Sequence, residues 1–349
     1  MINKYSYQTL HSHTKDSDGL LTHREVLNIC SKYNIGVVAF TDHDTLPNEK
    51  TLKLLKKEKK HPTKWIVGIE ISSGWPLDLG GGATSGLHVV GLFVDPFNRE
   101  LLDHCTKAKE ARITRMRMMV KNLVSLGFKI TEKDCLRSSV GETVGRPHIV
   151  TALSYHPENS KVYDALRKRM KNDSKNDQDI KRKYEDMILR GDSQYPYVLF
   201  LSDDSYIKNI YVDYQYYSDF DSTVSLIRNA GGLAILAHWG SCRFKMTDEY
   251  MDGIFKKNRI DGAETVYGLW NYESGKWTEQ EKELKILKKL VGQHDKLHSG
   301  GADAHTRKDF EQFVNEQWFS ERTVGLIENI IKKSNVDTVW SSLGITNIK

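Results

Sequence analysis

Residues 35–45 read IGVVAFTDHDT, an uninterrupted apolar run that ends in residues able to bind a metal ion. Continuous apolar runs of this kind are typical of strands that are buried on both faces of a parallel sheet. In such folds the functional side chains lie at the carboxyl ends of the strands. The stretch therefore predicts an α/β fold in which His43 stands at the functional edge of a sheet.

The same pattern recurs along the chain, where apolar runs contain or lead into a histidine or a carboxylate. These runs contribute Glu70, His88, His238, Asp303 and His305. Thr22, with Glu25 three residues later, is a helix-capping pattern ahead of the run at residues 35–40, so helices alternate with the strands. We expect the side chains at the strand ends to converge on one site.

Two histidines near the start of the chain, His11 and His13, give the most specific signal for metal binding. Side chains two positions apart on an extended strand point to the same side, so both rings can bind one ion. A lone histidine in an apolar run is more often a hydrogen-bonded core residue, and that alternative applies to His88 and His238 taken singly. The HxH pair, followed by Asp18, favours a metal site.

The candidate metal ligands are six histidines and three carboxylates: His11, His13, Asp18, His43, Glu70, His88, His238, Asp303 and His305. Imidazole suits zinc and iron, and carboxylate suits manganese. One zinc ion takes about four ligands, and a catalytic ion keeps one position open for water. We therefore expect two or three divalent ions (Mn, Fe or Zn) that share bridging carboxylates.

Seven motifs follow one another along the chain: HSHTKDSDG, FTDHDT, GIEIS, HVVGLFVD, GRPHIV, GGLAILAH and GADAH. In this order they resemble the PHP (polymerase and histidinol phosphatase) domain, and most of all its stand-alone phosphoesterases. The resemblance covers nearly the whole chain and leaves residues 157–205 and the C-terminal tail unmatched. It implies a distorted (β/α)7 barrel with a charged, mainly helical insertion.

The resemblance also implies how the ligands are divided among the ions. The implied groups are His11, His13, Glu70 and Asp303 for one ion, Glu70, His88 and His238 for a second, and Asp18, His43 and His305 for a third. Glu70 would bridge the first two ions and so take part in catalysis.

Residues beside the expected metal site are candidates for binding substrate. Arg146 precedes a proline at an expected helix start and can present its planar guanidinium to an anionic oxygen. Because the resemblance places an Arg-Pro-His element beside the metals, we assign Arg146 to the phosphate and His148 to a secondary role. The alternative for Arg146 is that it caps a neighbouring loop.

Two further assignments stay open at this point. The group that protonates the leaving oxygen is Asp42, His148 or a metal-coordinated water. Trp239 follows the expected ligand His238 and is a candidate for stacking on a nucleobase, with packing in the pocket wall as the alternative.

Composition bounds the domain organisation. We expect one catalytic domain over residues 1–349, with a charged insertion or cap at 157–205 and a helical tail at 320–349. Charge-rich segments are normally solvated helices, although a basic excess also attracts polyanions. The whole-chain formal charge of +5 does not by itself indicate nucleic-acid binding.

The chain has no apolar stretch long enough to cross a bilayer, and its start lacks the hydrophobic core of a signal peptide. We expect a cytoplasmic protein with no membrane partner. Its four cysteines form no CxxC pair and are expected to be reduced.

The function expected from these residues and the resemblance is metal-dependent hydrolysis of a phosphate ester by a metal-activated water. The expected substrate is a nucleotide or another small phosphorylated metabolite. A PHP-type exonuclease acting on DNA or RNA ends is one alternative, and a regulatory metal-binding module without catalysis is another. The oligomeric state is left open.

Overall fold

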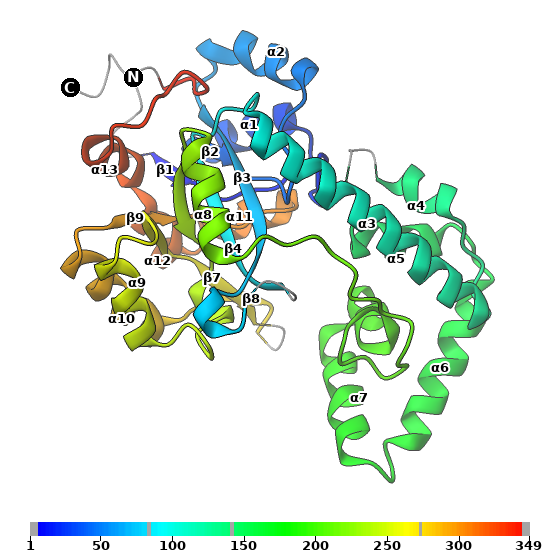
Figure 1. Cartoon of the computed structure of the whole chain (residues 1–349). Helices are drawn as coiled ribbons and strands as arrows, with labels where there is room; N and C mark the ends of the chain where they lie inside the picture. The colour runs from blue at the N-terminus through cyan, green and yellow to red at the C-terminus, as the bar shows by residue number, and fades with distance from the viewer. Residues whose placement is uncertain (1–5, 82–84, 140–142, 272–273, 344–349) are drawn as a thin grey trace. The chain divides into compact units, whose positions relative to one another are not determined.

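The computed structural model describes residues 6–81, 85–139, 143–271 and 274–343, which fall into two compact units (Figure 1). The first unit comprises Met1–Ala108, Tyr217–Trp270 and Trp277–Lys349, and the second comprises Lys109–Tyr216 and Asn271–Lys276. The insertion expected at residues 157–205 lies within the second unit, and a single catalytic domain over residues 1–349 stays a prediction.

A seven-stranded sheet forms the centre of the first unit. In spatial order its strands are β1 (Tyr7–Thr9), β2 (Ile35–Phe40), β3 (Lys64–Gly74), β4 (Ser85–Leu92), β5 (Leu233–Leu236), β6 (Gly262–Val266) and β9 (Leu297–Gly300). β1, β2 and β3 are mutually parallel, as are β5, β6 and β9. The predicted α/β class with a largely parallel sheet is confirmed.

Strand β4 departs from the predicted alternation of strands and helices, because it runs antiparallel to both β3 and β5. Only a short 3-10 turn (Leu77–Leu79) is described between β3 and β4, with no α-helix to carry the chain back across the sheet. A parallel crossover usually needs such a helix, so the two strands form a hairpin. An apolar run alone does not reveal this change of direction.

Both faces of the sheet are buried, as the apolar runs predict. On β2, Val38 and Phe40 pack in the core shared with the surrounding helices. Val37 and Ala39 point to the other face and pack with residues of the other strands and with Ile327. The alternation of side chains along an extended strand produces these two cores.

The chain segments that continue from the two outer strands of the sheet also pair with each other. The Leu10 N–H donates to the Gly300 carbonyl oxygen at 3.0 Å, and the His13 N–H donates to that of Ala304 at 2.9 Å. Ser12 and Ala304 form a parallel bridge. Residues 10–13 therefore lie directly against residues 300–304.

Helices connect the strands of the first unit. They are α1 (His23–Lys32), α2 (Glu49–Lys57), α8 (Phe220–Asn229), α9 (Asp248–Lys256), α10 (Glu281–Gln293), α11 (Arg307–Asn315), α12 (Gln317–Ser320) and α13 (Leu326–Lys333). The predicted capping box is present at α1, where the Glu25 N–H donates to the Thr22 hydroxyl and the Glu25 carboxylate accepts from the Thr22 N–H. A two-stranded ribbon of β7 (Gly268–Asn271) and β8 (Lys276–Glu279) completes the strands.

Of the helical tail expected at residues 320–349, the structure describes residues up to 343, and residues 344–349 lie outside the described part of the chain. Helix α13 buries Leu326, Ile327 and Ile330 against the sheet. After it the chain is extended and pairs with β3, where Ser341 forms an antiparallel bridge with Ile66. An amphipathic pattern identifies the helix but not the strand-like pairing that follows it.

The second unit is helical. α3 (Arg99–Ser125) enters it and is followed by α4 (Glu132–Ser138), α5 (Arg146–Ser154), α6 (Asn159–Asp173), α7 (Gln178–Arg190) and a π-helical turn at Tyr197–Leu201. The unit has a hydrophobic core of its own, which includes Met119, Leu153, Met170 and Phe200. The expected charged, mainly helical segment at 157–205 corresponds to α6, α7 and the turn.

Among the described residues, no helix is both long and apolar enough to cross a membrane. All four cysteines are unpaired, and burial raises the pKa of the Cys30 and Cys242 thiols.

Candidate metal centre

His11 and His13 lie just after β1, on the segment that is paired on both sides. Ser12 between them is held by the Thr41 hydroxyl on one side and by the bridge to Ala304 on the other. Both imidazoles are fully buried and their ring centroids are 5.2 Å apart. The extended backbone therefore turns both rings to the same side, as the HxH spacing predicts.

The residue after β9 must be small for His11 to occupy this place. A Cβ atom on Gly301 would lie 2.5 Å from the backbone nitrogen of His11, which is closer than real contacts allow. Glycine permits this close approach of two backbones. The close packing brings Asp303 and His305 next to the HxH pair.

The structure brings the four side chains of the first implied ligand group together. His11, His13, Glu70 and Asp303 each offer a ligand atom, and these atoms all lie within 4.8 Å of one another. His13 Nε2 is 3.0 Å from Asp303 Oδ1, and His11 Nε2 is 3.2 Å from Glu70 Oε2. Side chains from three distant parts of the sequence thus form one compact set of donors.

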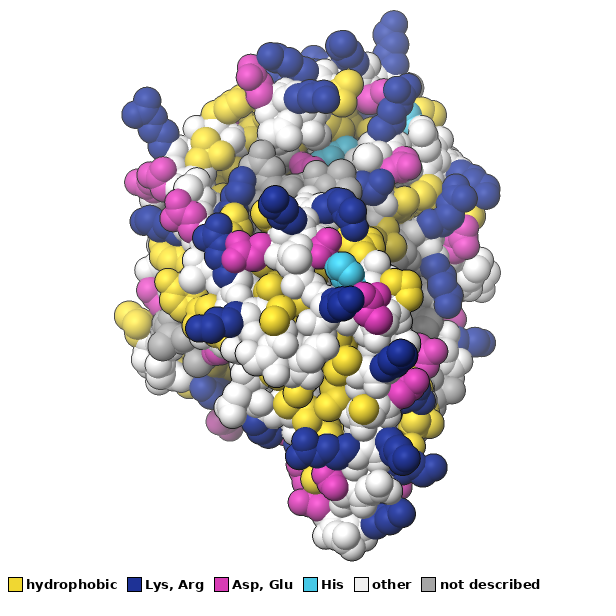
Figure 2. All heavy atoms as spheres, turned by 90° about the vertical axis from the view of Figure 1, so that its right-hand side faces the viewer, with side chains coloured by type: hydrophobic (Ala, Val, Ile, Leu, Met, Phe, Trp, Pro, Cys, Tyr) yellow, Lys and Arg dark blue, Asp and Glu magenta, His cyan; other side chains and the backbone are white. Residues whose placement is uncertain are grey.

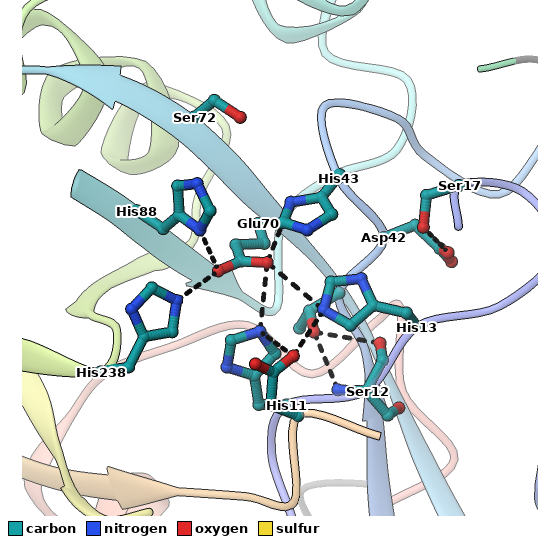
Figure 3. A network of polar contacts seen from close by, with 12 residues as sticks. His11, Ser12, His13, Ser17, Asp42, His43, Glu70, Ser72, His88 and His238 are labelled. Atoms are coloured by element: carbon teal, nitrogen blue, oxygen red, sulfur yellow. Dashed lines mark hydrogen bonds and ion pairs between the residues drawn. The ribbon is translucent and has the colours of Figure 1, made fainter. Parts of the chain in front are cut away.

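Glu70 faces two of the implied groups at once (Figure 3). Its Oε1 atom is 2.8 Å from His88 Nδ1 and 3.1 Å from His238 Nε2. Its Oε2 atom is 3.2 Å from His11 Nε2 and 3.3 Å from His13 Nε2. This two-sided position suits a carboxylate that bridges two cations.

His43 belongs to two compact sets of donor atoms, although the resemblance implies only one metal-ligand group for it. Its Nδ1 atom is 3.0 Å from Glu70 Oε2, and with Glu70 and His88 it forms one compact donor set. It also forms a compact set with His13, Asp18 and His305. The third implied group is therefore present and is extended by His13.

Two of these residues have unusual backbone conformations. His238 follows β5 with φ of 27°, and Asp303 follows β9 with φ of 47°. Left-handed conformations in residues other than glycine cost energy and are concentrated at functional sites. His238 lies two positions after β5 and Asp303 three positions after β9, and both side chains contact the cluster.

The cluster holds buried polar atoms that lack hydrogen-bond partners among the described residues. These atoms are His11 Nε2, His13 Nδ1 and Nε2, Asp18 Oδ1, His43 Nδ1, Glu70 Oε2 and Asp303 Oδ1. Buried polar groups are nearly always satisfied in native proteins, so such a concentration needs an explanation. Nitrogen and carboxylate oxygen atoms that face one another across a few ångströms fit bound divalent cations.

The electrostatics of the cluster point the same way. Burial alone would lower the pKa of His13, but Asp303 and Glu70 outweigh it and raise that pKa to about 10. Burial would raise the pKa of Glu70, yet the surrounding histidines, His43 and His11 foremost, hold it well below its ordinary value. Without cations Asp303 and Glu70 hold a proton on His13, and a bound cation would take the place of that proton.

Asp42 and Asp44 flank His43 and hold the loop that carries it. Asp42 is buried and accepts hydrogen bonds from the Thr14 N–H, the Thr14 hydroxyl and the Ser17 hydroxyl, at 2.7, 2.8 and 2.6 Å. Asp44 accepts from the N–H and the hydroxyl of Ser72. These contacts favour a positioning role for Asp42 over the role of general acid.

Trp239, which the sequence makes a candidate for stacking on a nucleobase, is buried in the structure. Its side chain is fully buried in the hydrophobic core, and its indole N–H donates to the Met246 carbonyl oxygen at 2.7 Å. A ring with no exposed face cannot stack on a substrate base. The structure favours the alternative of packing, because apolar contacts at the base of the loop enclose the ring.

Arg146 and His148 belong to the second unit, where they begin helix α5. The Arg146 guanidinium donates to the Leu201 carbonyl oxygen at 3.2 Å and lies near the rings of Tyr197 and Tyr211. His148 Nδ1 accepts from the Gly145 N–H at 2.8 Å and so caps the helix. Their assignments to substrate stay predictions.

Sequence reasoning missed one buried carboxylate, Glu264 on β6. It contacts the ring of His11 and the backbone of His238. The signal was available in the segment GAETV, where a single ionisable residue interrupts a short run between glycine and valine. A buried carboxylate inside a strand calls for specific partners.

Comparisons with known proteins agree with the motif-based interpretation. The chain is 23% identical over 320 residues to the 5'-3' exoribonuclease Rnm of Salmonella typhimurium, covering 91% of each chain. It is 25% identical over 232 residues to the 3',5'-nucleoside bisphosphate phosphatase of Chromobacterium violaceum, covering 66% of each. No family model matches the sequence.

Solved structures share the fold. A protein from Bifidobacterium adolescentis described as a metal-dependent phosphoesterase aligns with a TM-score of 0.61 and 23% identity, over 86% of this chain and 88% of the other. An amidohydrolase from Chromobacterium violaceum with bound sulfate aligns with a TM-score of 0.62 and 21% identity, over the same shares. The resemblance that the motifs indicate is thereby confirmed at the level of the fold.

Proposed function

We propose that this chain, whose motifs and fold resemble those of the stand-alone PHP phosphoesterases, hydrolyses phosphate esters with the help of two or three divalent metal ions. The observation that carries the proposal is the position of Glu70, whose two oxygen atoms face different sets of histidines. The nine predicted ligands would hold the ions in three adjoining groups. We also propose that the sheet curves into a distorted barrel. The pairing of residues 10–13 with residues 300–304 supports this.

Bound cations would supply Lewis acidity toward water and toward the phosphoryl oxygens. The residues themselves hold the donors in place and exclude bulk water, because His11, His13 and Glu70 are almost completely buried. Asp303 is more exposed, with 39% of its side chain accessible, and so marks the open side of the cluster. Arg146 is proposed to bind the substrate phosphate.

A nucleotide or another small phosphorylated metabolite is the proposed substrate. One of the similar proteins, the bisphosphate phosphatase of Chromobacterium violaceum, acts by its name on a nucleoside bisphosphate. The metal-ligand groups would act on the phosphoryl group, which all phosphate esters share, so the proposal extends to the class of substrate. We also propose a cytoplasmic location. The complete donor set favours an enzyme over a regulatory module without catalysis.

An exonuclease acting on RNA ends is the second candidate function. The match to the Salmonella exoribonuclease spans 91% of both chains, whereas the match to the bisphosphate phosphatase spans 66%. The formal charge of residues 109–216 is +5, equal to that of the whole chain, so the excess positive charge belongs to the second unit. On the face drawn in Figure 2, Lys and Arg side chains are interspersed with Asp and Glu, which argues for weak attraction of a polyanion to this face.

A substrate panel assayed with metal-reconstituted protein separates these candidates. Chelator-stripped protein would be supplied with Mn2+, Fe2+ or Zn2+ and given mononucleotides, nucleoside bisphosphates, sugar phosphates and short RNA oligomers with a 5'-phosphate. Hydrolysis of the small esters without RNA turnover supports the first candidate, and stepwise release of mononucleotides from RNA supports the second. Equal hydrolysis with and without metal contradicts both.

A further inference from the structure

Glu264 is buried at the back of the metal centre, and both of its carboxylate oxygens are engaged. It lies on β6, between β5 and β9 in the sheet, and only 1% of it is exposed. Oε1 is 2.8 Å from His11 Nδ1, and Oε2 accepts a hydrogen bond from the His238 N–H at 2.8 Å. One carboxylate therefore contacts residues of two different ligand groups.

The contact with His11 determines which ring nitrogen faces the cluster. A carboxylate at Nδ1 favours the tautomer that carries its proton there, which leaves the lone pair of Nε2 available. That Nε2 atom is 3.2 Å from Glu70 Oε2 and 3.5 Å from Asp303 Oδ1. Glu264 thus orients the ring and prepares the nitrogen that would bind the cation.

The contact with His238 acts on the backbone. His238 has φ of 27°, a conformation that needs support in a residue with a side chain. Its N–H is fixed by Glu264, and its Nε2 atom is 3.1 Å from Glu70 Oε1. The hydrogen bond holds the turn after β5 in the form that directs the ring at Glu70.

We propose that Glu264 is a positioning residue that sets the geometry of two metal-ligand groups on opposite sides of Glu70. It touches neither group's cation-facing atoms, so it acts through His11 and His238. The inference rests on the proposed metal-dependent function and adds a residue that couples the two halves of the centre. Because one side chain serves both groups, its loss should weaken binding of more than one ion.

Asp261 provides a matched control for effects on folding alone. It precedes β6, accepts a hydrogen bond from the Ala234 N–H at 2.8 Å and pairs with Arg228. It therefore also joins the β5 and β6 segments through a carboxylate, but its side-chain partners are Ala234 and Arg228, neither of which is a candidate ligand. Glu264→Gln and Asp261→Asn make the same chemical change in the two places.

The test measures binding of Mn2+ by isothermal titration calorimetry on the chelator-stripped full chain. For Glu264→Gln we expect affinity to fall about 10–100-fold, the range typical of residues that orient metal ligands. Glu264→Asp, which keeps the charge on a shorter side chain, should recover part of the loss. Asp261→Asn should lower the melting temperature without changing Mn2+ affinity.

Circular dichroism identifies any variant that does not fold, and Glu264→Asp then decides the question in place of Glu264→Gln. Unchanged stoichiometry and affinity in every folded Glu264 variant would overturn the inference. So would a loss of the same size in Asp261→Asn. If the proposed function fails instead, the wild-type chain binds Mn2+ but hydrolyses no phosphate ester, and the titration still decides the role of Glu264.

Discussion

Glu70 Oε1 lies 2.8 Å from Nδ1 of His88, a residue 18 positions later on the neighbouring antiparallel strand. Glu70 is opposite Val90 and His88 is opposite Ser72, so the pair is diagonal on one face of the hairpin. Diagonal neighbours are within reach of long side chains. The hairpin thus brings a carboxylate from β3 and an imidazole from β4 to the same place.

Replacing this carboxylate tests whether Glu70 is shared. Glu70→Gln keeps the shape but removes the charge that faces His11 and His13 on one side and His88 and His238 on the other. We expect phosphoesterase activity to fall by more than about 100-fold, beyond the effect typical of a residue outside the ligand set. Bound manganese, measured by mass spectrometry, should fall by more than one ion per chain.

Glu25→Gln is the control for this substitution, because Glu25 is an exposed carboxylate in the capping box of α1. It should cost only helix stability of up to about 1 kcal/mol and leave metal content unchanged. A Glu70→Gln protein with full metal content and full activity would exclude the bridging role.

The pH dependence of stability separates metal-free from metal-loaded protein. In metal-free protein the pKa of His13 is raised from 6.5 to about 10, because its carboxylate partners outweigh burial. A raised pKa contributes stability that is complete below pH 6.5 and is lost as the pH rises toward 10. The melting temperature in EDTA should therefore fall across this window, while saturating Mn2+ should flatten the curve. Parallel curves with and without metal would contradict this.

Trp239 is expected to act through packing. Trp239→Phe removes the hydrogen bond to Met246 and part of the buried ring, at a cost of about 1–3 kcal/mol of unfolding free energy. The KM for nucleotides should not change. A tenfold rise in KM with unaltered stability, measured by urea unfolding and steady-state kinetics, would instead restore the stacking interpretation.

Arg146 is predicted to bind the substrate phosphate. Arg146→Lys keeps the charge but loses the planar, two-pronged geometry, so KM for phosphate esters should rise while Mn2+ affinity stays the same. Equal kinetics in wild type and variant would favour the local role seen in its contact with Leu201. Calorimetric titration of Mn2+ provides the check on the metal centre.

Two exposed lysines of α6 test the nuclease candidate. Lys168→Gln with Lys171→Gln removes positive charge from the second unit. If RNA runs along this helix, the slope of log affinity against log salt should shrink by about 0.7 for each lost phosphate contact. Hydrolysis of p-nitrophenyl phosphate should be unaffected. An unaltered salt dependence for RNA would remove α6 from the binding surface.

Much of the metal centre can be predicted from the sequence, because residue spacing along a strand and apolar runs are local patterns. The HxH spacing places His11 and His13 on one side of a strand, and apolar runs predict the buried strands that carry Glu70 and His88. The direction of β4 is not local, since it depends on the connection that precedes it. The expectation that functional side chains lie at the carboxyl ends of strands does not hold for Glu70 and His88. Both lie within the strands of the β3–β4 hairpin.

The supporting residues were harder to predict, because their roles depend on contacts across the fold. Glu264 is 253 positions from its partner His11, and no spacing in the chain links the two. Trp239 follows a ligand in sequence, yet its ring turns into the core. Two neighbouring residues of one loop, His238 and Trp239, therefore have different roles.

Anomalous diffraction from crystals soaked in Mn2+ tests the central claim most directly. The account predicts two or three manganese peaks within bonding distance of the nine ligand side chains, with Glu70 contacting more than one of them. A fully active crystal with no manganese peak at Glu70 would contradict it.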